Sequence, residues 1–501
     1  MKLLSFLFAF SFFPFSSFGA VYFVSPSGSD QNDGSLEAPF ATLGRAQSLV
    51  AAGDTVFFRA GSFVVDQSEI MHKDGTYART FFLNKSGRKG APICYFAYPG
   101  DDRPVFDFSN VRPDSLRVSA FLLGGSYLHL RGFDIVGVQV TIEGHTQSEC
   151  VSARNGSYCI VENVAMHNGM AIGYYQTAGH NNLVLNCDAY ENYDDFSEGA
   201  KGGNVDGFGG HVAHDSDTAN VFRGCRAWFN SDDGFDLINA RTPFTIDHCW
   251  SFCNGYAPNS SVGAGDGTGF KSGGYGMSTT DEVNAPAVIP MHMVVFCLAY
   301  NNRLKGFYAN HHLGGIFWQN NSAYQNSSNF CMLCRESPSL PPVDVDGYGH
   351  VLSNNMSYRP RSSGAHLIDC DEDLCSLSMN TFGPSVSLGE PAKSDFLSLD
   401  WEELKNPRLP DGSLPDIDFL KAKAGSSIAV NNVGYAWQGG VADVSVLHDI
   451  HSLPGQPVCV YNLDGRLVLK STCPVSAIFN ELVPGVYVIN GKLISDKRCL
   501  P

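Results

Sequence analysis

Short apolar runs recur through the middle of the chain, and most are followed by one six-residue phrase. Runs such as 183–185 and 245–247 are rich in β-branched or large apolar residues, too short for a helix, and flanked by turn residues. The phrase has Ala or Ser third, Met or an aromatic residue fourth, and Asn last. It ends at Asn168, Asn192, Asn230, Asn254, Asn302 and Asn326, which lie 24, 38, 24, 48 and 24 residues apart. The pattern indicates a unit near 24 residues with insertions in two places.

Repeated short strands with turns at fixed positions, and no helical pattern between them, favour an all-β fold, a parallel β-helix. A right-handed path is the default for parallel connections. The recurring asparagines would stack at one turn of each coil, where their side chains can hydrogen-bond up and down the stack.

The two ends of the repetitive region carry different patterns. Residues 21–24 and 55–58 are predicted strands, and 41–52 has the apolar spacing of a short amphipathic helix that would cover the open N-terminal end. The period decays after about residue 355, and residues 397–408 are predicted to form an irregular or helical segment against the side or far end. We predict one β-helix domain over residues 20–440.

Residues 441–501 differ in character. Residues 458–468 and 485–494 each have the pattern of two strands joined by a turn, which predicts a small separate β module. This module resembles the C-terminal modules of exported proteins in the Bacteroidetes, some of which act as sorting signals.

The N-terminus has the layout of a secretory signal peptide over residues 1–19, with Lys2, an apolar run and small residues near a cleavage point. No later segment approaches the ~20 apolar residues that a membrane-spanning helix needs. We therefore expect a secreted protein, periplasmic, cell-surface or extracellular. A monomer is the default expectation, because nothing in the sequence indicates an oligomer.

Charge narrows the set of partners. Fifty acidic residues against 33 basic residues give a formal net charge of −17, which argues against nucleic acid and anionic membrane surfaces. An acidic protein that acts on an acidic substrate would need a cation between them.

The chain has 15 cysteines, an odd number. Four of them occupy one repeat position and are interpreted as small core residues: Cys187, Cys225, Cys249 and Cys297. Three close pairs are candidate disulfides in an exported protein: Cys150 with Cys159, Cys370 with Cys375, and Cys459 with Cys473. The Cys331-x-x-Cys334 pair alone is a weak metal or redox signal, because no second pair follows at zinc-site spacing.

A second phrase follows the asparagine position: Asp206-Gly-Phe-Gly209, Asp233-Gly-Phe-Asp236, Thr268-Gly-Phe-Lys271 and Lys305-Gly-Phe-Tyr308. If these are equivalent strands of successive coils, they lie ~4.8 Å apart. Asp206 would then sit beside Asp233, and Asp236 beside Lys271.

Four carboxylates would meet in this arrangement: Asp206, Asp232, Asp233 and Asp236. Such a cluster repels itself, and a hard divalent cation with oxygen ligands, Ca²⁺ outside the cell, would remove the difficulty. The alternative without a functional role is a solvated acidic loop. Strict strand alternation would also place Asp233 on the face of Phe235, so a bend is required there.

Lys271 beside this cluster is either a salt-bridge partner or a catalytic base. Calcium and a lysine base suit β-elimination from a uronate sugar, in which the C5 proton is removed, the C4 oxygen leaves and a 4,5-unsaturated sugar results. A free lysine has a pKa of about 10.4, so this base needs nearby positive charge or an alkaline medium.

These motifs resemble those of the family 9 polysaccharide lyases, pectate lyases with a right-handed parallel β-helix. The resemblance covers roughly residues 20–435 and is most specific in 204–209, 231–236 and 269–273. It implies that Asp206, Asp232, Asp233 and Asp236 are calcium ligands and that Lys271 is the Brønsted base. It also implies an acidic plant cell-wall polysaccharide as substrate, either homogalacturonan or the rhamnogalacturonan I backbone.

Residues on the following coils are candidates for holding further substrate carboxylates or sugar rings: Arg303, Lys305, Tyr308, His311 and Arg335. Two other classes stay open. A β-helix glycoside hydrolase would also align acids, although Lys271 would then have no task. A glycan-binding β-helix without catalysis would not need a lysine in register with the acids.

Overall fold

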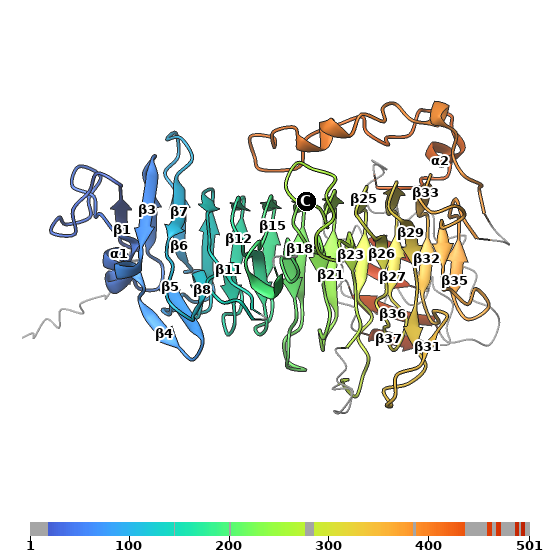
Figure 1. Ribbon diagram of the computed structural model, residues 1–501, viewed down its shortest axis with the longest axis horizontal. Helices are drawn as coiled ribbons and strands as arrows, with labels where there is room; N and C mark the ends of the chain where they lie inside the picture. The colour runs from blue at the N-terminus through green and yellow to red at the C-terminus, as the bar shows by residue number, and fades with distance from the viewer. Residues whose placement is uncertain are drawn as a thin grey trace, which may run out of the picture.

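The computed structural model describes residues 19–435 except 145, 200–201, 276–284 and 384–386, and four strands near the C-terminus. Its body is a stack of parallel coils with three strand-bearing sides (Figure 1). This confirms the all-β, right-handed parallel β-helix that the repeat predicts.

Each side of the stack is one sheet, whose strands follow one another from the N-terminal end. Sheet A contains β1 (Val21–Val24), β2 (Thr55–Phe58), β6 (Ile93–Ala97), β9 (Leu128–Arg131), β12 (Ile160–Glu162), β15 (Leu183–Leu185), β18 (Asn220–Arg223), β21 (Phe244–Asp247), β24 (Met293–Val295), β27 (Phe317–Gln319), β32 (Val351–Ser353) and β35 (Ser376–Ser378). Sheet B contains β3 (Ser62–Asp66), β7 (Val105–Asn110), β10 (Asp134–Val136), β13 (Ala165–His167), β16 (Asp188–Tyr190), β19 (Arg226–Trp228), β22 (Trp250–Phe252), β25 (Leu298–Tyr300), β28 (Ser322–Tyr324) and β33 (Met356–Tyr358). Sheet C contains β4 (His72–Asp74), β5 (Tyr77–Leu83), β8 (Arg117–Leu123), β11 (Glu149–Ala153), β14 (Ile172–Gln176), β17 (Phe208–Gly210), β20 (Phe235–Asp236), β23 (Phe270–Lys271), β26 (Lys305–Tyr308), β29 (Ser328–Cys331) and β34 (Leu367–Ile368).

The interior is a column of stacked side chains. Phe208, Phe235, Phe270, Phe307 and Phe330 are fully buried, and neighbouring rings stack with centroids 4.9–5.0 Å apart. These are the phenylalanines of the Gly-Phe phrase and their successor. The column fixes the register of sheet C because a one-residue slip would turn every ring to the outer face.

A ladder of buried asparagines runs beside this core. The Asn192 Nδ2 group donates to Asn230 Oδ1, and the same bond continues through Asn254, Asn302 and Asn326, with distances of 3.0–3.1 Å. The predicted asparagine stack is confirmed for these five residues.

Asn168 was wrongly placed in this stack by the sequence pattern. Met166 pairs with Ala189, so Asn168 lies opposite Glu191 and donates to its carboxylate instead of joining the ladder. Gly169 takes the ladder position, and its N–H donates to Asn192 Oδ1. This coil is one residue shorter than the repeated phrase suggests.

The cysteine column lies in the core as predicted, with Cys187, Cys225, Cys249 and Cys297 all fully buried. Two of the candidate disulfides are wrong, because the four cysteines concerned are free thiols: Cys150, Cys159, Cys370 and Cys375. The third candidate, Cys459 with Cys473, lies outside the residues whose side chains the structure describes.

The predicted Cys150–Cys159 disulfide is wrong because the two cysteines lie on different sides of the stack. Cys150 lies on β11 of sheet C, whereas Cys159 precedes β12 of sheet A, and its thiol donates to the Gly125 carbonyl. In the second pair, the Cys375 thiol donates to the Gly347 carbonyl. Cys331 and Cys334 are also free and buried.

The predicted N-terminal helix is α1 (Leu43–Leu49), shorter than residues 41–52. Thr42 caps it by accepting the Arg45 N–H, and Leu43 and Ala46 are buried. It lies at the N-terminal end of the stack (Figure 1).

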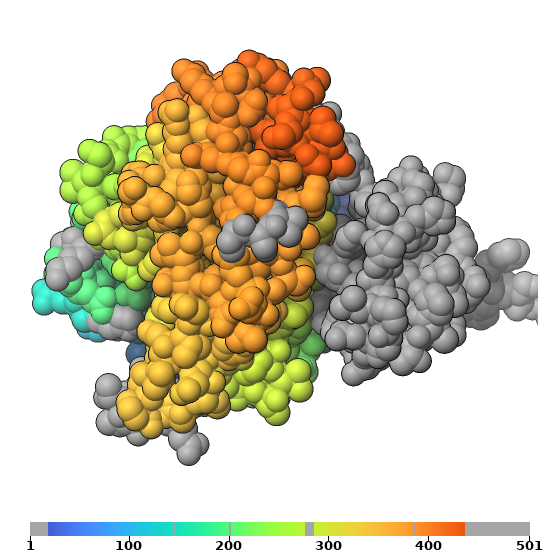
Figure 2. All heavy atoms as spheres, turned by 90° about the vertical axis from the view of Figure 1, so that its right-hand side faces the viewer, coloured from blue at the N-terminus to red at the C-terminus, as the bar shows by residue number. Residues whose placement is uncertain are grey.

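Residues 388–435, which we call the strap, run back along the outside of sheet B (Figure 1, orange). They contain η3 (Lys393–Asp395), η4 (Trp401–Lys405) and α2 (Ser427–Val430), in agreement with the irregular or helical segment predicted for 397–408. Strap residues such as Phe419 and Tyr435 pack on the aromatic outer face of sheet B, including Trp250 and Tyr300. Figure 2 looks onto the C-terminal end of the stack, which residues of the last coils and the strap cover.

Short elements complete the described chain: η1 (Gln67–Glu69), η2 (Ser197–Gly199) and an antiparallel pair, β30 (Cys334–Arg335) with β31 (Asp344–Val345). Near the C-terminus, β36 (Val458–Asn462), β37 (Leu467–Ser471), β38 (Val486–Ile489) and β39 (Lys492–Ser495) form an antiparallel sheet. These are the strands predicted for the C-terminal module. Among the described residues, no helix is long and apolar enough to cross a membrane. The predicted signal peptide lies outside the described residues but for Gly19.

Candidate active site

The side-by-side arrangement predicted for the Gly-Phe phrase is present on sheet C, where equivalent residues of successive coils form two columns. Gly209 pairs with Asp236, Asp236 with Lys271, and Lys271 with Tyr308. The residues that precede each strand are also in step, because successive glycine N–H groups donate to the carbonyls of Asp233, Thr268 and Lys305 at 2.8–2.9 Å. Insertions of different length therefore leave the columns intact.

The required bend lies before each strand. Asp206 and Asp233 precede β17 and β20, so strand alternation does not govern their side chains. A Cβ added at Gly234 would lie 2.1 Å from Ser251 Oγ, which explains why glycine follows the aspartate there. The aspartates are thereby free to face away from the phenylalanine core.

Backbone N–H groups hold the carboxylates in place. Asp206 Oδ1 accepts the Asp233 N–H at 3.1 Å, and Asp233 Oδ1 accepts the Thr268 N–H at 2.6 Å. Asp232 accepts the N–H groups of Asn204 at 2.8 Å and Asp266 at 2.7 Å. These donors orient the acids.

Burial and mutual repulsion raise the carboxyl pKa values. Asp206 and Asp233 are 4% and 0% exposed. Burial, with the charges of Asp232 and Asp236, raises the pKa of Asp233 to about 7. The pKa of Asp206 and that of Asp232 are raised as well, chiefly by burial. The cluster is thus electrostatically strained as it stands.

Lys271 offsets part of the negative charge of these carboxylates. Its Nζ lies 2.9 Å from Asp236 Oδ2 and 3.2 Å from Asp233 Oδ2. Burial acts to lower the lysine pKa, but the carboxylates of Asp236, Asp233 and Asp206 outweigh it and raise the pKa. Burial also acts to raise the pKa of Asp236, but Lys271 and His211 outweigh it and lower that pKa.

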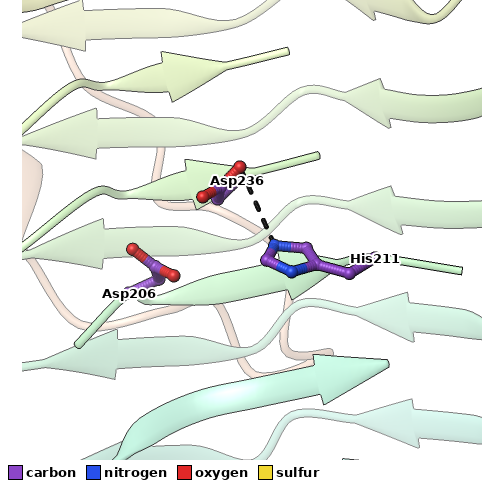
Figure 3. A group of neighbouring side chains, drawn as sticks. All are labelled: Asp206, His211 and Asp236. Carbon is purple, nitrogen blue, oxygen red and sulfur yellow. Dashed lines mark ion pairs between the residues drawn. The ribbon is translucent and has the colours of Figure 1, made fainter. Parts of the chain in front are cut away.

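His211 is a member of the site that the repeated phrases did not reveal. Its Nε2 lies 3.7 Å from Asp236 Oδ1, and its Nδ1 is 3.3 Å from the Tyr175 hydroxyl. Figure 3 shows His211 and Asp236 facing each other from neighbouring coils, with Asp206 on the same coil as His211. His211 lies two residues after Gly209 on the same strand face, and this spacing could have revealed it.

The five candidate substrate-binding residues lie in three places. Lys305 and Tyr308 are close to Lys271, and the Lys305 Nζ lies 4.4 Å from the Tyr308 ring centroid. Arg303 instead donates to the Gly265 carbonyl at 3.0 Å, and so supports the loop beside Asp232.

His311 and Arg335 lie further along the stack and share one partner. His311 Nδ1 is 2.7 Å from Asp344 Oδ1, and Arg335 Nε is 3.1 Å from the same oxygen. Asp344 therefore offsets part of the Arg335 charge, and the structure does not bring His311 or Arg335 into the carboxylate cluster.

The donor set fits a hard cation. Ligand atoms of Asp206, Asp232 and Asp233 lie within 4.8 Å of one another, as do those of Asp206, His211 and Asp236. Among the described residues, the buried Asp233 Oδ2 accepts no hydrogen bond, and its ion-pair partner is the Lys271 Nζ at 3.2 Å. Oxygen-rich, anionic sites of this kind suit Ca²⁺ better than Zn²⁺ or copper. The residues present could hold a metal ion.

Comparison with known proteins identifies the family to which this β-helix belongs. The family described as "Pel9A-like, right handed beta helix region" matches residues 22–354. The chain belongs to this family. Pectate lyase L of Dickeya dadantii (strain 3937) is 33% identical over 414 residues, which cover 81% of this chain and 85% of that protein.

Solved structures agree with this assignment. A rhamnogalacturonan lyase is 47% identical with a TM-score of 0.81, over 83% of this chain and all of that chain. The pectate lyase Pel9A is 30% identical with a TM-score of 0.64, over 82% of this chain and 90% of that chain. This member of the Pel9A-like family is a polysaccharide lyase.

Proposed function

We propose that this chain cleaves a galacturonate-containing pectic polymer by calcium-dependent β-elimination. The observation that carries the proposal is the contact of Lys271 with Asp233 and Asp236 inside a group of four carboxylates. A candidate base thus lies beside a candidate cation-binding group, a combination that suits elimination at a uronate.

Asp206, Asp232, Asp233 and Asp236 would hold the metal. Calcium, when bound, would supply the positive charge that lowers the lysine pKa and withdraws electron density from the sugar carboxylate. The Lys271 Nζ then accepts the C5 proton, the electrons of the C5–H bond form a C4–C5 double bond, and the glycosidic oxygen leaves C4 with the electrons of the broken C4–O bond and takes a proton from water. The backbone N–H donors at Asp206, Asp232 and Asp233 keep the acids fixed, so little reorganisation is needed.

Two pectic polymers remain candidates, because both present galacturonate at the cleaved bond. The 47% identity to a rhamnogalacturonan lyase, against 30% for Pel9A, favours the rhamnogalacturonan I backbone as the first substrate to test. Homogalacturonan is the second.

The route out of the cell forms part of the proposal. The residue pattern of 1–19 supports removal of a signal peptide, and that of 441–501 supports a separate module with a sorting role. The mass of the secreted form would test both boundaries. A monomer is the simplest state for a chain with this net charge.

The test is ultraviolet absorbance of each polymer incubated with the protein, first with calcium and then with a chelator. We expect a rise on rhamnogalacturonan I that the chelator abolishes. New reducing ends without absorbance would mean hydrolysis, and no change on either polymer would contradict the proposal.

A further inference from the structure

Three arginines surround one tyrosine on sheet C, on the N-terminal side of the carboxylate cluster. Arg79, Arg154 and Arg117 place their guanidinium carbons 4.0, 4.5 and 5.5 Å from the Tyr77 ring centroid. The Tyr77 hydroxyl accepts hydrogen bonds from Arg154 at 2.8 Å and from Arg117 at 3.1 Å.

Two of these arginines, Arg79 and Arg154, share one buried carboxylate. Glu149 is fully buried and pairs with Arg154, and its charge also acts on Arg79. Asp74 lies 3.8 Å from Arg79 but is largely exposed, and the buried Arg79 Nε has no hydrogen-bond partner among the described residues. Arg79 and Arg154 thus bring two positive charges to one buried carboxylate, and a bound anion would offset the remaining charge.

A chain of contacts joins this group to the candidate active site. The Arg154 guanidinium lies 5.9 Å from the Tyr175 ring, and the Tyr175 hydroxyl contacts His211, which faces Asp236. Arg154 directly follows β11, and Asp236 lies on β20. These two strands are three strand spacings apart in sheet C, or ~14 Å. The two groups therefore lie on one sheet, several coils apart.

Arg154 has donor capacity left for a ligand. Its hydrogen bonds use Nε, to Ser152, and Nη2, to Tyr77 and Glu149. Within the described chain Nη1 makes no hydrogen bond, and 23% of the side chain is exposed. A guanidinium with free N–H groups beside an aromatic ring is suited to a sugar carboxylate.

We propose that Arg154, beside Tyr77, forms a subsite that binds the carboxylate of a uronate residue remote from the cleaved bond. This inference rests on the proposed function, because it assumes that one polymer chain lies along sheet C past Lys271. The subsite gives an acidic enzyme a second attraction for an acidic substrate, separate from the metal.

Arg154→Gln is the direct test. Arg154→Gln/Glu149→Gln is a second variant in which the buried carboxylate that pairs with Arg154 is neutralised too, while Asp74 remains 3.8 Å from Arg79. Arg223→Ala is the control, since Arg223 is an exposed arginine paired with Asp247 on sheet A. Thermal unfolding first establishes that each variant is folded.

We expect the Arg154 variants to raise KM for the polymer ~10- to 100-fold while kcat changes little, because each variant loses one charged hydrogen bond to the substrate. Calorimetry with an oligosaccharide of the polymer that the wild type prefers, in the presence of chelator, should show weakening of similar size. The Arg223 variant should match the wild type in both measurements.

Unchanged KM and unchanged binding in the folded double variant would overturn the inference. Equal weakening for a methyl-esterified, neutral oligomer would contradict carboxylate recognition. If the wild type forms no unsaturated product, the proposed function fails, and the calorimetric comparison alone still decides the subsite.

Discussion

At the scale of single residues, the site gathers more negative charge than its one lysine offsets. Lys271 contacts two carboxylates, yet the pKa of Asp206 and that of Asp233 stay raised. One lysine therefore does not neutralise four acids. A metal that did so would also leave the lysine less firmly protonated.

The pH dependence of stability follows from these shifts. Unfolded aspartates lose their protons near pH 3.8, whereas Asp233 in the fold keeps its proton to about pH 7. Between these values the folded state binds more protons, so the free energy of unfolding of chelator-treated protein should fall as pH rises. Calcium requires the deprotonated acids, so its stabilising effect should grow over the same window.

Thermal unfolding with calcium and with chelator, at about pH 5 and about pH 8, would check this. We expect the calcium-induced rise in Tm to be larger at the higher pH. A rise of equal size at both pH values would contradict it, and Asp233→Asn should reduce the rise.

At the scale of the elements, the asparagine ladder holds neighbouring coils in register. Asn254 is fully buried, donates to Asn302 and Ala227, and accepts from the backbone and side chain of Asn230. Each ladder member thus satisfies polar groups of its neighbours as well as its own.

Asn254→Ala should lower the free energy of unfolding by ~2–4 kcal/mol, because buried donors and acceptors of adjacent coils lose their partner. Denaturant unfolding measures this. Asn406→Ala removes an exposed side chain at the end of η4 and should cost less than ~0.5 kcal/mol. Equal effects of the two substitutions would show that the ladder adds no stability.

The columns could be predicted because the Gly-Phe phrase keeps its register across insertions of any length. The ladder position of Asn168 was wrong because the same phrase occurs in a coil one residue shorter. His211 has no counterpart in the other coils, so a search for repeats passes over it. The strap has no period, and its contact with sheet B depends on residues far apart in the chain.

At the scale of the whole molecule, the strap ties the late chain to much earlier coils. Arg408 donates to Asp188 at 2.6 Å and to the carbonyls of Cys187 and Gly224. Arg226 also pairs with Asp188 at 2.7 Å. Since the strap lies on sheet B, it leaves the outer face of sheet C to the candidate site.

Arg408→Ala should lower the free energy of unfolding by ~2–4 kcal/mol, since it removes one partner of a buried ion pair and leaves carbonyls unsatisfied. Limited proteolysis should then cut the strap sooner than in the wild type. Lys423→Ala, an exposed substitution on the same segment, is the control and should change neither result. An Arg408 variant as resistant as the wild type would show that the contact does not hold the strap.

The most direct test of the proposed chemistry is product formation by Lys271→Ala. Ultraviolet absorbance on the wild type's preferred polymer with calcium, together with calcium titration calorimetry, separates loss of the base from loss of the metal. We predict at least a ~1,000-fold fall in rate with calcium binding retained. A variant that binds calcium and still forms unsaturated product at a rate near that of the wild type would contradict Lys271 as the base.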